Sequence, residues 1–292
     1  IVPRYWTMRG YYVERRFGWD VHGLPIEMEV QKQLGLDDPQ QINDFGIGKF
    51  NEACRSQVQT NTENWERVTR KIGRWVDFEN DYKTMDIDFM ESVWWVFKNL
   101  WENDLIYKDY KVLPYSWSAA TPLSNFEANM DYRDVEDPSI FFTLTARGDF
   151  NKIQKSDKFL VWTTTPWCIP GNLAIAIGKD IEYLRIQITD DIFWIAKNLI
   201  SELKDYEYKI LDESIGADMI GAEYIPAYSE YEHEYSNGAF RLIHSDDTNT
   251  EAGSGLVSQA PAYGESDFYA LKEANIDVIV DPVTLSGKFD NS

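Results

Sequence analysis

The sequence holds few cysteines and few histidines for a chain of 292 residues. Cysteine occurs only at Cys54 and Cys168, and histidine only at His22, His233 and His244. Two cysteines cannot build a disulfide framework or a Cys-rich zinc cluster. Three widely spaced histidines argue against a His-rich metal site. We therefore expect no metal centre in this chain, and in particular no zinc.

Basic residues are also scarce. The chain has 28 Lys+Arg against 49 Asp+Glu, which gives a formal net charge of −21 and an isoelectric point near 4.5. Binding to phosphates needs clustered Lys and Arg, so bulk charge cannot hold this chain on a nucleic acid. A nucleic-acid substrate that is positioned by a few local contacts is still possible.

Long apolar runs are missing as well. No stretch of 18 apolar residues occurs, which argues against a membrane-spanning helix. The first residues, Ile-Val-Pro-Arg-Tyr-Trp, include no initiator Met and no signal-peptide pattern, so we expect a cytoplasmic protein whose natural start lies upstream. Aromatic residues, by contrast, make up 15% of the chain, and that much ring surface excludes disorder.

The beginning of the chain has the pattern of an α/β fold. Residues 11–17 are rich in β-formers and predict a strand, which Gly18 bounds. A loop with two glycines follows, and Pro25 and Gly35 are suited to the two ends of a helix over 25–34. Strand, glycine-bounded loop and helix in this order are typical of α/β proteins.

Apolar spacing predicts further helical structure downstream. The region 50–72 has apolar residues near helical spacing, and another helix follows Asp88. Asp88 and Glu91 have the spacing of a capping box at its start. An apolar stripe runs from Phe89 to Trp101, and we expect these rings to lie in the core.

The pattern changes near residue 138. Short apolar or alternating runs, separated by turn residues, lie at 141–145, 159–163, 173–177, 183–188 and 192–196. This spacing predicts a β-rich domain, a barrel or a curled sheet. We therefore expect two domains, 1–137 and 138–292.

The loop Gly18-Trp19-Asp20-Val21-His22-Gly23 follows the first predicted strand. Ligands bind at the carboxyl ends of strands in open α/β sheets. The Asp20 carboxylate can pair there with a cationic group such as an amino acid's ammonium, and His22 can orient a ligand. The structural alternative, which this loop alone favours, is that Asp20 caps the next helix and His22 is an ordinary loop histidine.

Three consecutive threonines, Thr163, Thr164 and Thr165, end a predicted strand. On a loop that two prolines stiffen, their hydroxyls can bind an ester or a ribose hydroxyl and position a water. Strand propensity alone also favours threonine, but it does not require the continuation Pro-Trp-Cys-Ile-Pro at 166–170.

A glycine-containing segment over 253–267 ends in a second carboxylate, Asp267. Glycines at 253, 255 and 264 permit a close approach of the backbone. Asp267 is a candidate for binding an ammonium group. It is alternatively the N-cap of a helix over 267–274.

Together and in this order, these segments resemble the isoleucyl-tRNA synthetases, which are class I aminoacyl-tRNA synthetases. The form Gly-Trp-Asp-x-His-Gly-Leu-Pro-x-Glu favours them over the leucyl and valyl enzymes. Asp-Tyr-Lys-Thr-Met-Asp at 81–86, Asp-Phe-Met-Glu-Ser-Val-Trp-Trp-Val-Phe at 88–97 and Thr-Pro-Leu-Ser-Asn-Phe-Glu-Ala at 121–128 strengthen the similarity, which runs through the whole chain.

The resemblance implies an α/β fold in two parts. Residues 1–137 would be part of a Rossmann-type catalytic domain, and 138–292 an inserted β-rich editing domain, connective peptide 1, incomplete at its C-terminal end. The implied activity is the ligation of L-isoleucine to tRNA(Ile) through isoleucyl-adenylate, with ATP and Mg²⁺ as substrates, in a monomer. Editing of Val-tRNA(Ile) accompanies it, because a hydrophobic pocket discriminates on one methylene by only roughly 10- to 200-fold, as is known for this enzyme family.

The resemblance also assigns residues to two sites. In the synthetic site Asp20 would hold the ammonium of isoleucine, while Gly18, Trp19 and His22 would shape the pocket for the amino acid and adenylate. The implied editing pocket is lined by Thr163, Thr164, Thr165 and Asn172. Asp267 would bind the ammonium of misattached valine there.

The chain departs from the family in several places. The His-Ile-Gly-His motif is expected before residue 1 and the Lys-Met-Ser-Lys-Ser loop after residue 292, so we expect a fragment that cannot activate an amino acid alone. Ser258 stands where the family usually has a histidine that helps to exclude isoleucine, so we expect weaker rejection of isoleucine. Cys168 and Gly171 are also unusual. Two alternatives stay open: a free-standing editing hydrolase of mischarged tRNA and a non-catalytic synthetase paralogue.

Overall fold

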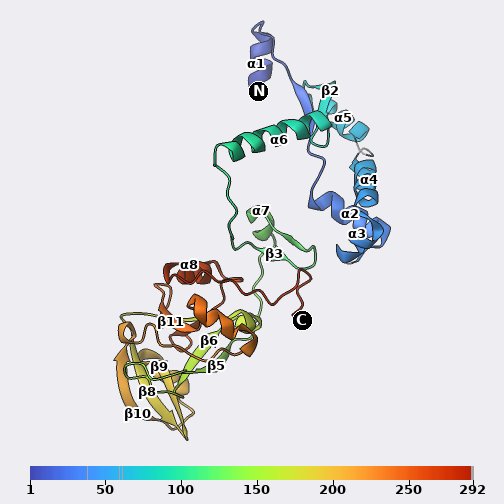
Figure 1. The fold of residues 1–292 in the computed structure, drawn as a ribbon. Coiled ribbons are helices and arrows are strands. Elements are labelled where there is room, and N and C mark those ends of the chain that lie inside the picture. Colours follow the sequence, from blue (N-terminus) through green and yellow to red (C-terminus); the bar gives the residue numbers. More distant parts are fainter. Residues whose placement is uncertain (38, 59, 61, 291–292) are drawn as a thin grey trace. The chain divides into compact units, whose positions relative to one another are not determined.

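The computed structural model describes residues 1–37, 39–58, 60 and 62–290. The chain divides into two compact units, Ile1–Asp109 and Tyr110–Ser292 (Figure 1). The predicted boundary at 137/138 falls within the second unit, and the limits of the two domains stay a prediction. Each unit is described below by itself.

The first unit contains a parallel pair of strands, β1 (Arg16–Trp19) and β2 (Asp77–Lys83). Parallel neighbours need a long crossover, and helices supply most of it here. These helices are α2 (Leu24–Leu34), α3 (Pro39–Phe45), α4 (Ile47–Val58) and α5 (Thr62–Lys71). Helix α1 (Val2–Met8) precedes the pair and α6 (Ile87–Glu102) follows it.

The first strand lies later in the sequence than the 11–17 that the composition predicts. It begins at Arg16 because only from there does β1 have a partner, with Arg16 opposite Asp77 and Gly18 opposite Tyr82. A Cβ on Gly18 would lie 2.5 Å from the Tyr82 ring, so a larger residue at 18 would force that ring to move.

The predicted helices form, with different ends. Helix α2 ends at Gly35, which has a left-handed φ of 68°, and the helical region 50–72 is divided into α4 and α5. The predicted capping box at Asp88 is wrong. Helix α6 begins two residues earlier with Asp86 as its N-cap, and the Asp86 carboxylate accepts a hydrogen bond from the Lys83 backbone N–H at 2.8 Å.

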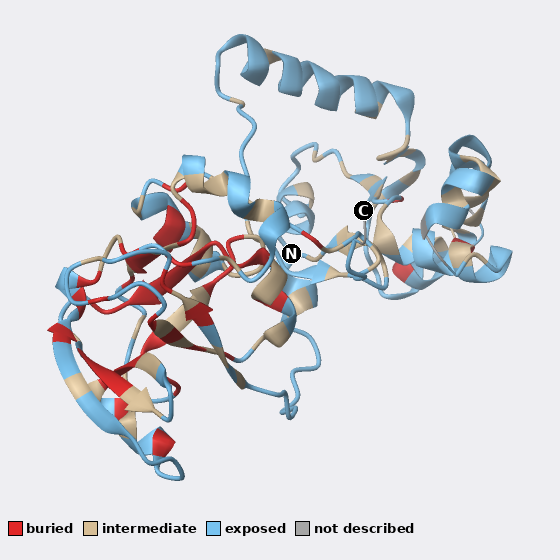
Figure 2. Cartoon of the chain, turned by 60° about the horizontal axis from the view of Figure 1, so that its bottom comes forward, coloured by how far each residue is buried: buried red, intermediate tan, exposed pale blue. Residues whose placement is uncertain are grey.

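The expectation that the rings of α6 lie in a core is wrong in this structure. No residue of α6 is buried, and Trp94 and Trp95 are 68% and 64% exposed. Among the described residues of the first unit, the buried apolar side chains are Val21, Val30 and Phe50. Helical spacing thus identifies an apolar face, of which only Phe89, stacked on Tyr82 with ring centroids 5.9 Å apart, has a ring partner from another described element of this unit (Figure 2).

The second unit is built on a curled, mixed eight-stranded sheet. Its strand order is β10-β8-β9-β6-β12-β7-β11, and β5 pairs with β6. The strands are β5 (Ile140–Thr145), β6 (Lys158–Thr163), β7 (Ala174–Ile177), β8 (Glu182–Ile188), β9 (Asp191–Ala196), β10 (Lys209–Ile215), β11 (Arg241–His244) and β12 (Leu256–Gln259). Every one of the five runs predicted from the sequence is a strand. The sheet divides at β6, which has β5, β9 and β12 as partners.

Short elements connect and cover this sheet. They are β3 (Tyr115–Ser116), β4 (Thr121–Pro122), α7 (Asn125–Ala128), α8 (Glu265–Glu273) and the 3₁₀ segments η2 (Pro166–Gly171), η3 (Lys197–Leu203), η4 (Gly216–Asp218) and η5 (Ser229–Asn237). Buried side chains concentrate in this unit (Figure 2), with Phe159, Tyr183, Trp194, Tyr224 and Phe240 the largest in the core.

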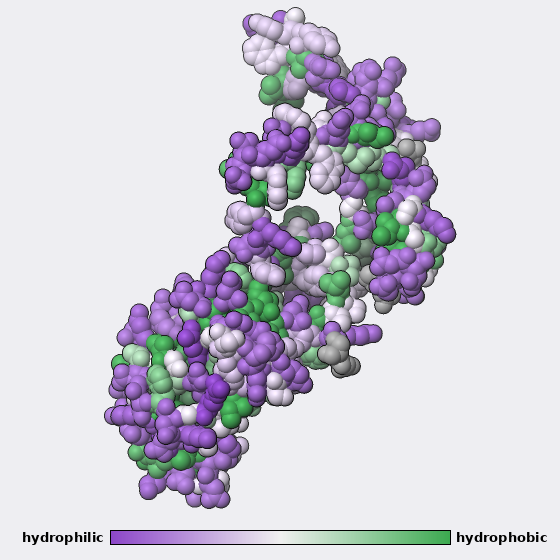
Figure 3. All heavy atoms as spheres, viewed as in Figure 1, coloured by the Kyte–Doolittle hydropathy of each residue, from purple (hydrophilic) through white to green (hydrophobic). Residues whose placement is uncertain are grey.

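The surface agrees with the acidic composition. Hydrophilic side chains cover much of the face in Figure 3. Among the described residues, no helix is long and apolar enough to span a membrane.

Candidate functional site

The three threonines lie where β6 passes into η2. Thr163 is buried, Thr164 is exposed and Thr165 is half-buried. The Thr165 backbone N–H donates to Thr163 Oγ1 at 3.1 Å, and the two side-chain oxygens are 3.3 Å apart. The Cys168 N–H in turn donates to the Thr165 carbonyl at 2.9 Å. The hydroxyls are therefore held by the turn itself, on a loop with a proline at each end.

Asn172 links this loop to a distant strand. Its Nδ2 donates to the Ala174 carbonyl and to Ser258 Oγ on β12, both at 2.9 Å. The pairing of β12 with β7, in which Ser258 lies opposite Ile175, brings the two segments together. A third segment joins them, because the Tyr224 hydroxyl donates to Asn172 Oδ1 at 2.6 Å.

Asp267 lies in the first turn of α8, but it does not cap the helix. The N-cap is Gly264, so the structural alternative for Asp267 is wrong. Its carboxylate accepts a hydrogen bond from the Ala260 N–H at 2.8 Å. Burial raises the pKa of Asp267, and the negative charge of Asp247 adds to this, although hydrogen bonds to the carboxylate oppose the shift.

Cys168 connects Asp267 with the threonine loop. Burial raises the pKa of the Cys168 thiol, and the charge of Asp267 raises it further, while a hydrogen bond with the Thr165 side chain lowers it. Both residues are therefore within interaction range of the same thiol. The structure pairs Thr163 with Thr165 and Asn172 with Ser258, and β6 and β12, which carry Thr163 and Ser258, are neighbouring strands. Thr164 lies on the threonine loop, and Asp267 acts on the Cys168 thiol through its charge.

Tyr263 contributes to this region and could not be identified from the sequence. A Cβ on Gly171 would lie 2.9 Å from its ring and 3.2 Å from the Val280 carbonyl oxygen. The Tyr263 hydroxyl donates to Asp281 Oδ1 at 3.0 Å. Glycine at 171 thus makes room for a ring that packs on η2.

The residues predicted for the synthetic site lie in the first unit. Trp19 Nε1 donates to Asp81 Oδ2 at 2.8 Å, and His22 Nδ1 is 3.1 Å from Thr84 Oγ1. The 81–86 segment therefore supports this loop. The Asp20 side chain is 84% exposed, and its Oδ1 lies 4.0 Å from His22 Nε2.

The structural alternative for Asp20 is also wrong. Helix α2 has Gly23 as its N-cap, with a φ of 112°, and no side chain caps it. Asp20 is left facing solvent next to a cavity of about 180 Å³ that Val21, His22, Glu27 and Cys54 help to line. An exposed carboxylate at the end of a strand can pair with an ammonium group.

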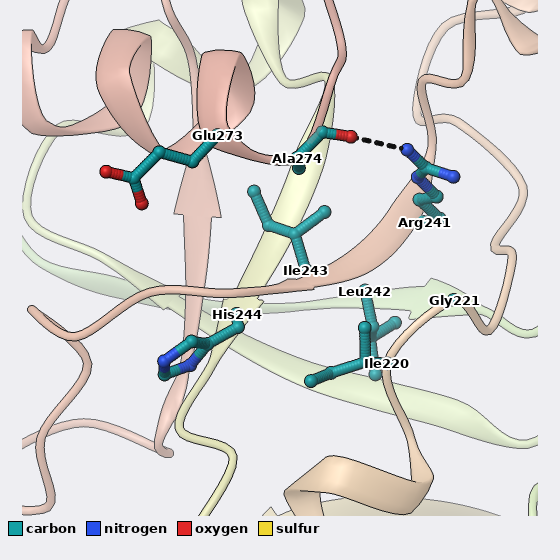
Figure 4. A pocket seen from close by; sticks show the side chains of 8 residues that line it. All are labelled: Ile220, Gly221, Arg241, Leu242, Ile243, His244, Glu273 and Ala274. Carbon is teal, nitrogen blue, oxygen red and sulfur yellow. Dashed lines mark hydrogen bonds between the residues drawn. The ribbon is translucent and has the colours of Figure 1, made fainter.

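A separate cavity of about 380 Å³ lies between β11 and the end of α8 (Figure 4). None of the predicted site residues lines it. Arg241 at its edge donates to the Ala274 carbonyl at 2.8 Å, and His244 Nε2 lies 3.0 Å from Asp246 Oδ1. Both polar groups are thus engaged by the protein itself.

Within the described ranges, no group of three or more His, Cys, Asp or Glu side chains could hold a metal ion. The chemistry that this geometry supports is therefore hydrogen bonding and ion pairing by hydroxyl, amide and carboxylate groups.

Comparison with known proteins identifies the family. The family model described as tRNA synthetases class I (I, L, M and V) matches residues 1–259. The chain belongs to the class I tRNA synthetases. The predicted fold class is confirmed with it, a class I synthetase α/β domain together with a curled β-sheet.

Among curated proteins, the chain is similar to isoleucine–tRNA ligases. It is 44% identical to the one from Bdellovibrio bacteriovorus over 295 residues, which cover 99% of this chain and 27% of that enzyme. For Mycobacterium leprae the identity is 46% over 297 residues, with 99% and 28% covered. The resemblance to isoleucyl-tRNA synthetases is thus confirmed. The chain spans about a quarter of the length of these relatives.

Solved structures of editing domains are more distant. The P. knowlesi cytosolic leucyl-tRNA synthetase editing domain is 11% identical with a TM-score of 0.39, and the match covers 46% of this chain and 60% of that one. No functional conclusion rests on this likeness.

Proposed function

We propose that this class I synthetase chain is a segment of an isoleucine–tRNA ligase and that its second unit carries the hydrolytic editing site for Val-tRNA(Ile). The observation that supports editing most strongly is the cluster at the end of β6. The side-chain oxygens of Thr163 and Thr165 lie 3.3 Å apart, and Asn172 donates a hydrogen bond to Ser258. The pairing of β6 with β12 at Trp162 and Val257 places Thr163 and Ser258 on neighbouring strands, and the charge of the half-buried Asp267 acts on the Cys168 thiol.

The proposed reaction is hydrolysis of an aminoacyl ester. The Asp267 carboxylate pairs with the ammonium of valine, and the threonine hydroxyls position the ester and a water. The water adds to the ester carbonyl, the bond to the ribose oxygen breaks, and the ribose oxygen receives a proton. Free valine and uncharged tRNA(Ile) leave.

The synthetic function belongs to the whole enzyme. There the carboxylate of L-isoleucine attacks the α-phosphate of ATP, supplied with Mg²⁺, and pyrophosphate leaves. A ribose hydroxyl of tRNA(Ile) then attacks the carbonyl carbon of the adenylate, the bond to the phosphate oxygen breaks, and AMP leaves. We assign Asp20 to the ammonium of isoleucine, and Gly18, Trp19 and His22 to the pocket around it. A cytoplasmic monomer stays our expectation.

The similarity of residues 1–109 to ligases opposes the reading as a free-standing hydrolase, because such a protein needs no synthetic segment. Isoleucine-dependent exchange of pyrophosphate into ATP by the full-length protein separates the possibilities. A ligase performs this exchange, whereas a hydrolase or a non-catalytic paralogue does not.

Replacing Ser258 with histidine should sharpen the discrimination of the editing site. Histidine is larger than serine, so Ser258→His should lower hydrolysis of Ile-tRNA(Ile) about tenfold more than it lowers that of Val-tRNA(Ile). Deacylation of both substrates by the full-length protein measures this, with Ser258→Ala as the control for loss of the hydroxyl. A wild-type protein that already discriminates between Ile-tRNA(Ile) and Val-tRNA(Ile) as sharply as Ser258→His would contradict this prediction.

The raised pKa of Asp267 predicts a pH dependence. Since only the ionised carboxylate pairs with an ammonium, deacylation should fall with decreasing pH in a range above the ordinary carboxyl pKa. The effect on stability has the opposite sign. The folded protein favours the protonated form of Asp267. The contribution of this group to stability is therefore fully present below the ordinary carboxyl pKa and is lost as the pH rises through the raised pKa of the folded state.

Two pH series check this prediction. The first is the single-turnover rate of Val-tRNA(Ile) deacylation by wild type. The second is the melting temperature of wild type and Asp267→Asn, which keeps an oxygen for the Ala260 N–H and should not lose stability as pH rises through the raised pKa. Identical melting profiles for the two proteins would contradict the assignment.

A further inference from the structure

Tyr224 is a fully buried tyrosine whose hydroxyl ends at the editing cluster. Its ring packs edge-on against Phe240, with centroids 6.0 Å apart, and its backbone N–H donates to the Phe240 carbonyl at 2.9 Å. Burial raises its pKa well above the ordinary value, so the hydroxyl stays protonated. The bond to Asn172 Oδ1, at 2.6 Å, is therefore one that Tyr224 donates.

The amide of Asn172 can adopt only one orientation in this network. A backbone carbonyl only accepts hydrogen bonds, so the amide atom that faces the Ala174 carbonyl must be the nitrogen. The second N–H of that nitrogen donates to Ser258 Oγ, and Oδ1 receives the Tyr224 hydroxyl. Both amide donors are thus used within the protein, and Asn172 acts on a substrate only through its neighbours.

Ser258 is the neighbour that can reach a substrate. It is half-buried on β12, and its oxygen already accepts the hydrogen bond from Asn172. Among the described residues, the Ser258 hydroxyl proton has no acceptor. Because the Ser258 oxygen accepts its hydrogen bond from the protein, its O–H is left to donate to a bound substrate.

We propose that Tyr224 is a positioning residue of the editing site, which acts through Asn172 to hold Ser258 with its proton toward an acceptor oxygen of the aminoacyl ester. This role rests on the proposed editing function. A tyrosine that only packs in the core would also donate to the Asn172 amide oxygen. In that case the effect of its removal on the deacylation rate would be the same whether or not the Ser258 hydroxyl is present.

A double-mutant cycle in the full-length protein distinguishes the two roles. The variants are Tyr224→Phe, Ser258→Ala and the combination, and the readout is single-turnover deacylation of Val-tRNA(Ile). Tyr224→Phe and Ser258→Ala should each lower the rate about five- to tenfold, and the combination should be no slower than Ser258→Ala alone. Charging of tRNA(Ile) with isoleucine should be unchanged in all three.

Tyr235→Phe is the matched control. It removes a hydroxyl from the same region, one that donates to the Tyr224 backbone carbonyl and not to Asn172. Its deacylation rate should stay near that of wild type. Should Tyr224→Phe fail to fold, Asn172→Asp replaces it, because a carboxylate cannot donate to Ser258 and must give the same non-additivity with Ser258→Ala.

Each outcome of the double-mutant cycle supports or overturns the positioning role of Tyr224. Additive losses, or wild-type deacylation by Tyr224→Phe, would overturn the positioning role and leave the editing function intact. A wild-type protein that hydrolyses no Val-tRNA(Ile) would overturn both. Melting temperatures of the variants show whether a lost rate reflects lost folding.

Discussion

Asp267→Ala should abolish hydrolysis of Val-tRNA(Ile) by the full-length protein, with a loss of about 10²–10³-fold. The carboxylate is half-buried and is held by the Ala260 N–H at 2.8 Å, so it is a fixed partner for an ammonium group. Removing one member of a hydrogen-bonded charge pair costs about 2–5 kcal/mol, or about 30- to 5,000-fold in rate, and the expected loss falls within that range. Single-turnover deacylation of Val-tRNA(Ile) is the measurement.

Two further variants separate charge from folding. Asp267→Asn keeps the shape and the hydrogen bond from Ala260 but lacks the charge, so it should be nearly as inactive as alanine. Glu265→Ala removes an exposed carboxylate from the same turn of α8 and should leave the rate unchanged. Isoleucylation should be unaffected throughout. Retained hydrolysis in Asp267→Ala would show that the ammonium contact is misassigned.

Asp157→Ala should destabilise the second unit by about 3–5 kcal/mol, because it leaves the Arg185 guanidinium buried without a counter-charge. Asp157 is 2% exposed and accepts two hydrogen bonds from Arg185, both at 2.8 Å, and one from Trp194 Nε1 at 3.0 Å. Urea denaturation of the 292-residue chain measures the free energy of unfolding.

The control for this prediction lies on the surface. Lys197 pairs with Glu182 at 3.0 Å and with Glu213 at 3.4 Å, but its side chain is 42% exposed. Lys197→Ala should therefore cost no more than about 1 kcal/mol. The double replacement Asp157→Leu/Arg185→Leu should cost less than Asp157→Ala, since no buried charge remains. A loss below 1 kcal/mol in Asp157→Ala would contradict the role of the pair.

Local patterns predicted the strands of the second unit better than the ends of the helices. The five apolar runs could be identified because alternation has a period of two, as in Phe159, Val161 and Thr163, which are all buried on one side of β6. The strands β10, β11 and β12 are not among the predicted runs, and β10 pairs with β8. The position of β11 and β12 depends on pairing with β7.

Carboxylates were ambiguous in the sequence because a helix cap and a ligand site use the same residue type. The backbone resolves this, since glycines at 23 and 264 take the N-cap positions and leave Asp20 and Asp267 free of that role. Tyr224 could not be recognised, because a buried tyrosine is ordinary in a core and its partner lies 52 residues away in the sequence. The apolar face of α6 was predicted, but periodicity does not reveal what covers a face.

The most direct test of an editing site in this chain is the single-turnover hydrolysis of Val-tRNA(Ile) by the full-length protein, with Asp267→Ala and spontaneous hydrolysis measured in parallel. We predict rapid loss of valine from the tRNA with wild type, and loss at close to the spontaneous rate with Asp267→Ala. Wild type that releases valine no faster than the spontaneous rate would contradict the editing function.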